Sequence, residues 1–212
     1  MIPADGFTNV RQKMVRNQIE KRGIENPDIL AAMRKVQRHL FVAPEYRKWA
    51  YDDKPLPIDK GQTISQPYIV ALMTELLELR ANSKVLEIGT GCGYQTAVLA
   101  ELAREVYSVE IIAELSKRAE ARLKTLNYHN IHFKKGNGYY GWIEHAPYDC
   151  VLVAAAPKRT PHRLTQQLAE GGRMVVPVGT DLQDLFLLKK SAGKVNTTKI
   201  TGVSFVPMTG KP

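Results

Sequence analysis

The hydrophobic pattern of residues 84–206 alternates between two periods, and this alternation predicts strands and helices in turn. Short apolar runs are typical of buried strands, whereas apolar positions that recur every three or four residues indicate amphipathic helices. Strands are predicted at 85–88, 105–109, 131–134, 150–154, 173–178, 185–190 and 199–206. Helices are predicted between them at 94–103, 113–126 and 164–170.

This alternation favours an α/β fold with a mostly parallel sheet, because parallel neighbours are joined by helices that cover both faces. Gly171-Gly172 is expected to form a turn before the fifth strand, and a polar hairpin at 191–198 to add antiparallel strands at the end. We expect a single domain over residues 1–212. Within it, residues 1–60 form an N-terminal helical extension and loop, and residues 61–212 form the α/β core.

The pattern before residue 61 predicts two helices and then irregular chain. The first helix ends at Gly23, and its inward face comprises Val10, Met14, Val15, Gln18 and Ile19. Asn26 followed by Pro27 is typical of an N-cap and a first helical position. The inward residues of this second helix are predicted to be Ile29, Leu30, Met33 and Val36. The proline-broken stretch 37–60 is long for a connection, so we expect it to be functional or covered by its own packing.

Residues 61–79, GQTISQPYIVALMTELLEL, predict a further helix, with apolar residues at helical spacing. Ser65 directly precedes Gln66-Pro67, and a serine at such a place is predicted to be the helix N-cap. Its hydroxyl at a helix start also suits a substrate anion, and the two roles are compatible. No G-x-S-x-G turn surrounds Ser65, so a hydrolase nucleophile is not predicted.

Composition and charge narrow the class of protein. The chain has 212 residues, 44% of them hydrophobic, and a net charge of +9. Its basic residues are scattered in short pairs, so nucleic acid is not an expected partner. The pair Lys158-Arg159 follows the fourth strand, near where ligands bind in open α/β sheets, and can either attract an anionic peptide or decorate the surface. We favour the surface. Cys92 and Cys150 lie in glycine-rich and apolar surroundings and are expected to be reduced thiols. With no signal core and no membrane span, a cytoplasmic protein is expected.

The stretch Val85 to Thr96, VLEIGTGCGYQT, predicts a buried strand, a tight glycine turn and a helix start. Glycines let the backbone approach a ligand closely, and the helix N-terminus offers unpaired N–H groups. Glu110 ends the next strand, twenty-one residues after Gly89. A carboxylate at that place accepts hydrogen bonds from the two ribose hydroxyls of a bound nucleotide. These features predict a nucleoside site.

The spacing of the turn distinguishes between two nucleoside cofactors. The glycines follow G-x-G-x-G, and Tyr94 stands where a dinucleotide site has its third glycine. Glu87, inside the preceding strand, would repel a pyrophosphate but suits a cationic ligand. S-adenosylmethionine carries a sulfonium, an ammonium and a ribose, so we favour it over NAD. The alternative is a glycine turn that binds no ligand and only lets the helix pack against the strand. The presence of both Glu87 and Glu110 is less consistent with this alternative.

Several motifs follow one another along the chain: MVRNQIEKRGI, AYDDKPLPI, GQTISQP, VLEIGTGCGYQT, VYSVE, GNGYYGW, APYDCVLVAAAP, GGRMVVPVG and FVPMTG. In this order and spacing the chain resembles the protein-L-isoaspartate O-methyltransferases, from about Met14 to Gly210. The glycine turn is common to many class I methyltransferases, but GQTISQP together with AYDDKPLPI is specific to this family.

The resemblance implies a Rossmann-like class I methyltransferase sheet of seven strands. It also implies transfer of a methyl group from S-adenosyl-L-methionine to the α-carboxylate of L-isoaspartyl residues, which initiates repair of damaged proteins and peptides through a succinimide. Isoaspartyl-containing proteins and peptides are then the expected partners. A monomer without a metal is expected.

The resemblance also implies residue roles. Ser65 matches the active-site serine, and Val206 and Thr209 match the strand and turn that flank the bound peptide. The implied cofactor-binding set is Gln62, Thr63, Ile64, Glu87, Gly89, Thr90, Gly91, Glu110, Ile111, Asn137 and Gly138.

The clearest departure from the family pattern is Asn137, which stands where the family has an aspartate beside the adenine. Its carbonyl oxygen can still accept from the adenine amino group, but the charge is gone, so weaker cofactor binding is expected. Two other functions stay open. One is a class I methyltransferase with another acceptor such as RNA, and the other is a non-catalytic binding protein that retains the fold.

Overall fold

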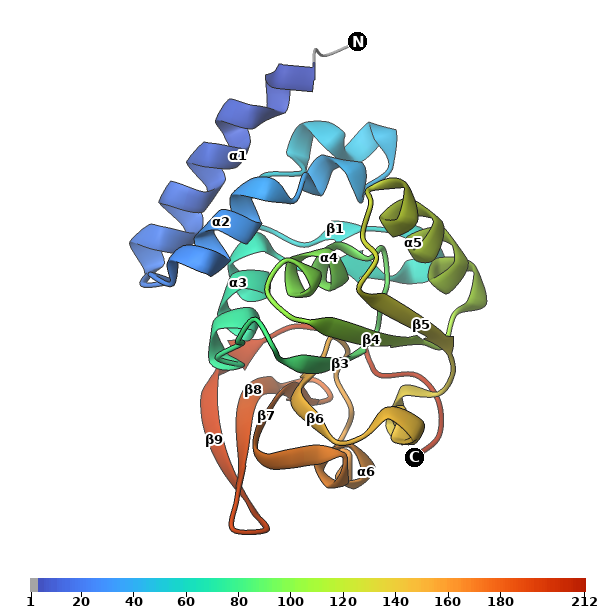
Figure 1. The fold of residues 1–212 in the computed structure, drawn as a ribbon. Helices are drawn as coiled ribbons and strands as arrows, with labels where there is room; N and C mark the ends of the chain where they lie inside the picture. Colours follow the sequence, from blue (N-terminus) through green and yellow to red (C-terminus); the bar gives the residue numbers. More distant parts are fainter. Residues whose placement is uncertain (1–3) are drawn as a thin grey trace.

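A seven-stranded sheet forms the centre of the computed structural model, which describes residues 4–212 (Figure 1). The strands are β3 (Lys84–Ile88), β4 (Glu105–Glu110), β5 (Ile131–Lys135), β6 (Tyr148–Val153), β7 (Leu168–Gly179), β8 (Gln183–Ser191) and β9 (Lys194–Val203). Their order across the sheet is β5-β4-β3-β6-β7-β8-β9. Strands β3 to β7 pair in parallel, and β8 and β9 pair antiparallel, which confirms the predicted fold class.

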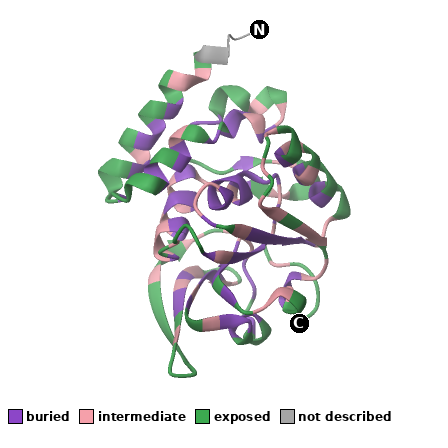
Figure 2. Ribbon diagram, viewed as in Figure 1, coloured by how far each residue is buried: buried purple, intermediate pink, exposed green. Residues whose placement is uncertain are grey.

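Helices cover both faces of the sheet because successive strand residues point to opposite sides. Helices α3 (Pro67–Leu76), α4 (Tyr94–Ala100) and α5 (Ala113–Thr125) lie on one face, and α6 (His162–Gln166) lies on the other. Val85 packs in the core beneath α3 and α4, whereas its neighbour Leu86 packs in the core that includes Leu164 of α6. Figure 2 shows the resulting buried interior on the central strands.

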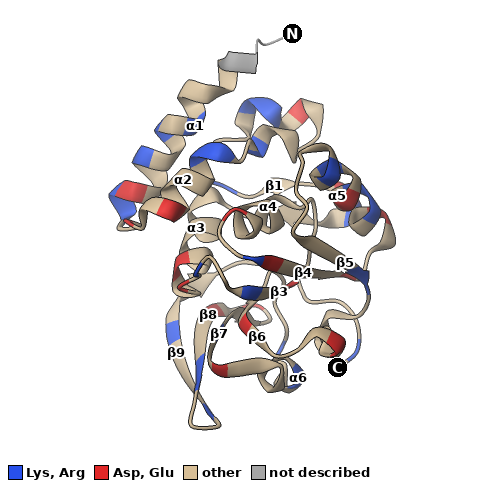
Figure 3. Cartoon of the chain, viewed as in Figure 1, with Lys and Arg blue, Asp and Glu red and all other residues tan. Residues whose placement is uncertain are grey.

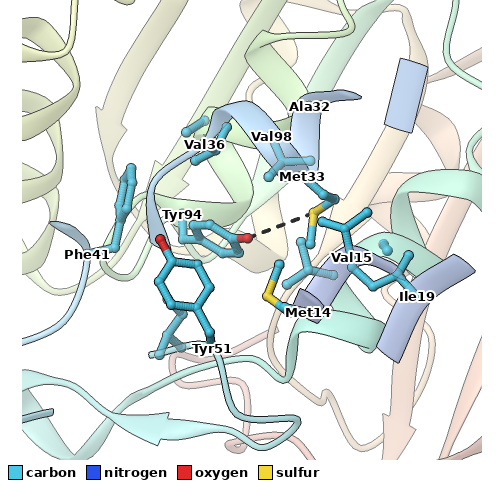
Figure 4. Packing of buried hydrophobic residues seen from close by; sticks show 14 of the residues in the cluster. Met14, Val15, Ile19, Ala32, Met33, Val36, Phe41, Tyr51, Tyr94 and Val98 are labelled. Atoms are coloured by element: carbon cyan, nitrogen blue, oxygen red, sulfur yellow. Dashed lines mark hydrogen bonds between the residues drawn. The ribbon is translucent and has the colours of Figure 1, made fainter. Parts of the chain in front are cut away.

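The N-terminal segment packs as a further layer on the α3 and α4 side. Helix α1 (Thr8–Met14) continues through a π-helical turn, Val15–Ile19, and a 3-10 turn, Glu20–Arg22, and ends at Gly23. Helix α2 (Pro27–Lys35) begins at the predicted cap, with Asn26 Oδ1 accepting from the backbone N–H of Asp28 at 2.9 Å. Figure 4 shows Met14 and Met33 beside Tyr94 of α4, with Val15 and Ile19 beyond these methionines in the same hydrophobic cluster.

One residue of the predicted inward face is wrongly assigned. Val10 is 42% exposed, whereas Met14, Val15 and Ile19 are almost fully buried. In the same turn Arg11 is buried and donates from Nε to the Arg34 carbonyl at 2.6 Å, so α1 meets the rest of the protein through Arg11 rather than through Val10.

The long connection 37–60 is ordered by its own packing, as the sequence suggested. It contains two 3-10 helices, Arg38–Leu40 and Pro44–Trp49, and strand β1 (Leu56–Pro57). Strand β1 pairs antiparallel with β2 (Thr63–Ile64). This small hairpin holds residues 62–65 in place above the main sheet.

The connection from α6 to β7 differs from the prediction. The helix ends at Gln166, and Leu168 already pairs with Tyr148 of β6. Gly171-Gly172 therefore lie within β7 rather than in a turn, at an irregularity before pairing resumes between Cys150 and Arg173. A Cβ at Gly172 would approach the backbone oxygen of Asp149 to 3.0 Å, so the close approach of the strands requires glycine there.

The last hairpin is also tighter than predicted. Ala192 and Gly193 form a two-residue turn with positive φ at both positions, and β9 starts at Lys194 instead of 199. Most residues of β9 are exposed because it is an edge strand, and polar edge strands carry a weak hydrophobic signal. Within residues 4–212, no helix is both long and apolar enough to cross a bilayer.

Candidate active site

A pocket of about 780 Å³ opens at the carboxyl ends of β3, β4 and β6. This is where the strand order reverses, since β3 is followed in the chain by β4 on one side and flanked by β6 on the other. Open α/β sheets bind ligands at such switch points. Most of the predicted site residues line the pocket: Gln62, Thr63, Ile64, Ser65, Gly89, Thr90, Gly91, Glu110, Ile111, Gly138, Val206 and Thr209. Glu87 and Asn137 do not line it.

The glycine turn presents its backbone to the pocket. Gly89 and Gly91 line the cavity with φ of 94° and 55°, a region in which side chains are strained. Gly93 has another role, because a Cβ there would lie 2.9 Å from Leu123 Cδ1 of α5. The first two glycines therefore shape the pocket, and the third allows α4 and α5 to pack closely.

Glu110 connects the end of β4 to this turn. Its Oε2 accepts from the Gly91 N–H at 2.8 Å, and its Oε1 accepts from the Ile112 N–H at 2.9 Å. The side chain is largely buried but lines the pocket. Each carboxylate oxygen can accept a second hydrogen bond, so the fixed carboxylate is suited to two neighbouring hydroxyls.

Glu87 lies beneath the turn, in contact with other polar side chains rather than with the pocket. Its Oε2 accepts from the hydroxyls of Thr96 and Ser108, both at 2.6 Å, and Oε1 has no hydrogen-bond partner in residues 4–212. Complete burial raises the pKa of Glu87 to about 7. Glu87 was predicted to contact a cationic ligand directly, but it lies below the residues that line the cavity.

Thr90 links Glu87 to the pocket. Its hydroxyl lies 2.6 Å from Ser108 Oγ. Because the single Ser108 proton is donated to Glu87, Thr90 is the donor in this pair. A hydrogen-bond chain therefore runs from a pocket-lining residue to a buried carboxyl group.

Ser65 is not the predicted N-cap of α3. Pro67 occupies the first helical position, so the cap is Gln66, and no side chain accepts from the free N–H groups. Ser65 lies one residue outside the helix, half-buried, and lines the pocket together with the β1–β2 hairpin residues 62–64. Its hydroxyl is therefore placed at the cavity instead of in a cap.

Asn137 is used differently from its predicted contact with adenine. Its Oδ1 accepts from the Tyr139 N–H at 3.1 Å, and its Nδ2 donates to the Lys211 carbonyl at 2.7 Å. The side chain thus ties the end of the chain to the loop after β5. The adjacent Gly138 does line the pocket, and a Cβ there would overlap Ile88.

The segment 205–209 forms the wall opposite the glycine turn. Ala156 donates its N–H to the Val206 carbonyl at 2.9 Å and accepts from the Met208 N–H at 2.8 Å. Val206 and Thr209 line the pocket as expected, and so do Met208, Ile112 and Ala155, which were not predicted. The rule that ligands bind beyond the carboxyl ends of parallel strands points to Ile112 and Ala155. In residues 4–212, no three His, Cys, Asp or Glu side chains are grouped to hold a metal ion.

The sequence matches a known family. The profile of the protein-L-isoaspartate(D-aspartate) O-methyltransferases matches residues 9–212. A protein-L-isoaspartate O-methyltransferase from a Picosynechococcus species is 54% identical over 207 residues, which cover 98% of this chain and 93% of that protein. A protein of the same name from Gloeobacter violaceus is 52% identical over 92% of this chain and 97% of its own length.

Solved structures show the same fold. A protein-L-isoaspartate O-methyltransferase superposes with a TM-score of 0.87 and 30% identity over 94% of this chain and 66% of its own length. A Plasmodium falciparum structure, described as a putative protein-L-isoaspartate O-methyltransferase in complex with S-adenosyl-L-homocysteine, has a TM-score of 0.81 and 24% identity. It covers 94% of this chain and 98% of the solved one.

Proposed function

The chain belongs to the protein-L-isoaspartate(D-aspartate) O-methyltransferase family, and from this membership we propose how its pocket residues carry out the reaction. The enzyme transfers a methyl group from S-adenosylmethionine to the free carboxylate of L-isoaspartyl residues in damaged proteins and peptides. The resulting ester collapses to a succinimide, part of which hydrolyses to normal aspartate.

We propose that Glu110 holds the ribose of the cofactor, and its geometry is the observation that carries the assignment. The carboxylate is fixed by two backbone N–H groups and keeps one acceptor site on each oxygen for the two hydroxyls. Gly89 and Gly91 give the methionine end room beside the backbone, while Ile111 and Gly138 flank the base. Glu87 acts on this end through Ser108 and Thr90, without a direct contact.

S-adenosylmethionine, when bound, supplies an electrophilic methyl group, and an isoaspartyl carboxylate is already a nucleophile at neutral pH. The protein therefore needs no general base. We propose that Ser65 donates a hydrogen bond to the acceptor carboxylate and aims one oxygen at the methyl carbon. Gln62 to Ile64 and Val206 to Thr209 cover the pocket from two sides and exclude competing water. Ser65 forms no covalent intermediate in this mechanism.

We further propose that the protein works as a monomeric single domain in the cytoplasm. One chain supplies the lining of the pocket, from residues 62–65 beside the β1–β2 hairpin to residues 206–209 after β9. The N-terminal layer shares a hydrophobic core with α4 and α5, which supports treating the chain as one domain. Cys92 and Cys150 are buried free thiols, in keeping with a reducing compartment.

Methyl transfer to three acceptors tests the function. We expect base-labile radiolabel on an isoaspartyl peptide, and none on the matching aspartyl peptide or on bulk RNA. Label on RNA alone would support the other methyltransferase class, and cofactor binding without any transfer would support a binding protein. The Lys and Arg residues are spread over several elements, without one basic stripe, which disfavours RNA (Figure 3).

A further inference from the structure

A second hollow, the flanking groove, lies beside the pocket. One side is formed by residues 158–161, which connect β6 to α6, with His162 at the start of α6, and the other by the β7–β8 turn at Gly179 to Asp181 with Gln183. Ala156, Pro207 and Met208 also line it. The space in the groove, counted together with the open solvent at its mouth, is about 1520 Å³, which makes room for several residues of an extended chain.

The groove and the pocket share a wall. Pro207 and Met208 line both cavities, and the backbone of this segment is fixed to Ala156 by two hydrogen bonds. An isoaspartyl residue with its carboxylate near Ser65 must continue into polypeptide on both sides. The shared wall therefore gives one arm of that polypeptide a direct route from the pocket into the groove.

The charges of the two cavities differ in sign. Among the residues that line the pocket, the charged one is Glu110, which is negative and would not attract an anionic substrate. The groove is lined by Lys158 and Arg159, both exposed, and by His162, with Asp181 as its acid. Among the residues that line these two cavities, the cations that can attract a negatively charged peptide thus lie in the groove.

The rim of the groove also carries an unusually exposed apolar residue. Leu182, at the tip of the β7–β8 turn, is 91% exposed. Its neighbours on both sides line the groove, together with Pro161 and Met208. An apolar side chain of a bound peptide can pack against these residues while its acidic neighbours face Lys158 and Arg159.

We propose that the flanking groove binds the polypeptide next to the isoaspartyl residue and selects acidic side chains in it. The proposal rests on the proposed function, since it assigns to the same reaction a subsite that determines which damaged segments are methylated. The recognised chemistry is a carboxylate on an unfolded or flexible segment of a protein.

Three isoaspartyl peptides that differ only in flanking glutamates, lysines or serines test the proposal. For the wild-type protein we expect kcat/KM to be about 3- to 10-fold higher with glutamates than with lysines, since each exposed charge pair contributes little. K158E/R159E should reverse the order of these two peptides. The preference should weaken as salt is added.

A matched control separates the groove from the overall positive charge. K13E/R16E makes the same change in net charge at two exposed residues, Lys13 of α1 and Arg16 of the turn that continues it, far along the chain from the groove. It should keep the wild-type preference. Thermal unfolding of both variants checks that the fold is intact. Equal loss of the preference in both variants would overturn the proposal, because the effect would then come from net charge alone.

A binding measurement keeps the proposal independent of turnover. The three peptides, labelled with a fluorophore, are titrated into the protein in the presence of S-adenosylhomocysteine, and their Kd values are compared. One possible result is that no peptide is methylated, while the glutamate peptide binds best and K158E/R159E reverses the order of the Kd values. This result would contradict the proposed function and support the groove as a peptide-binding site. If methylation proceeds and the three peptides bind equally, the groove assignment is wrong and the function stands.

Discussion

The two sides of the pocket are built in different ways. Its floor consists of the glycine turn 89–93 and the strand ends at Ile88 and 109–110, and these residues are buried except Gly89 and Gly91, which are half-buried. Its roof consists of residues 62–65 and 206–209, of which Thr63, Pro207 and Thr209 are exposed and most others are half-buried. The floor belongs to the central sheet, whereas the roof joins two segments from distant parts of the chain.

The hydrogen bonds that support the two sides differ accordingly. Below the floor, Glu87 and Glu110 accept from hydroxyls and backbone N–H groups that are shielded from water. The roof depends on the two-residue pairing of β1 with β2, on Ala156 and on Asn137. Regions with few buried contacts open locally at low free-energy cost. We infer that the floor sets cofactor affinity and the roof governs the acceptor and access to it.

The largest expected effect comes from the floor, with Gly89→Ala. The new Cβ would be held at φ of 94°, and it would lie 3.6 Å from Ala154 Cβ, which also lines the pocket. Backbone strain should shift the turn that lines the pocket and raise the Kd for S-adenosylmethionine by about 100-fold, as measured by calorimetry. Gly171→Ala is the control, because Gly171 has φ of 77° with open space around it, outside the pocket. An equal loss of affinity in both variants would contradict a specific role for the floor.

A second test of the floor uses the pH dependence of stability. The pKa of Glu87 is about 7 in the folded protein and near 4.5 when exposed, so between these values the folded state binds more protons. The free energy of unfolding contributed by Glu87 is therefore greatest below about pH 4.5 and declines as the pH rises through 7, by on the order of 3 kcal/mol. Urea unfolding from about pH 5 to pH 8 should show this decline in the wild type and lose it in Glu87→Gln.

The control for that measurement is Glu45→Gln, since Glu45 is exposed on the 3-10 helix Pro44–Trp49. It should keep the wild-type slope. If Glu87→Gln also keeps it, the buried carboxyl group is not the source of the pH dependence.

The roof is tested by Ser65→Ala. Loss of a hydrogen bond to a carboxylate costs about 1.5 to 3 kcal/mol, so methylation of a saturating isoaspartyl peptide should fall about 10- to 100-fold. Cofactor affinity should change by less than about twofold, because the hydroxyl serves the acceptor. Ser65→Thr, which retains a hydroxyl, should recover part of the activity. Unchanged turnover in Ser65→Ala would remove Ser65 from the proposed mechanism.

The floor could be predicted from sequence because its signals are local. Glycines at 89, 91 and 93 follow an apolar strand, and Glu110 follows at the end of the next strand. The hydrophobic period of the strands and the spacing of these residues are therefore enough to predict the floor. The roof could be placed only by resemblance. Residues 62–65 and 206–209 meet across the pocket through tertiary contacts with β1 and Ala156, which no local pattern encodes.

The errors in prediction arise where tertiary contacts override a local preference. Ser65 has the side chain of an N-cap, but Pro67 fixes the helix start one residue later. Gly171-Gly172 suggested a turn, yet they form an irregularity within β7, between its paired residues Leu168 and Arg173. Glu87 was correctly found beside the turn. Its orientation away from the cavity depends on Thr96 and Ser108, which come from two other elements.

The smallest effect, expected for Asn137→Asp, distinguishes directly between floor and roof. Aspartate can still accept from the Tyr139 N–H, but it cannot donate to the Lys211 carbonyl, so the end of the roof should loosen. Amide hydrogen exchange at residues 208–211 should become about two- to fivefold faster, as for the loss of one exposed hydrogen bond. Cofactor affinity should stay within about twofold, because Asn137 does not line the pocket. A tighter cofactor complex with unchanged exchange would instead place residue 137 beside the adenine, as part of the floor.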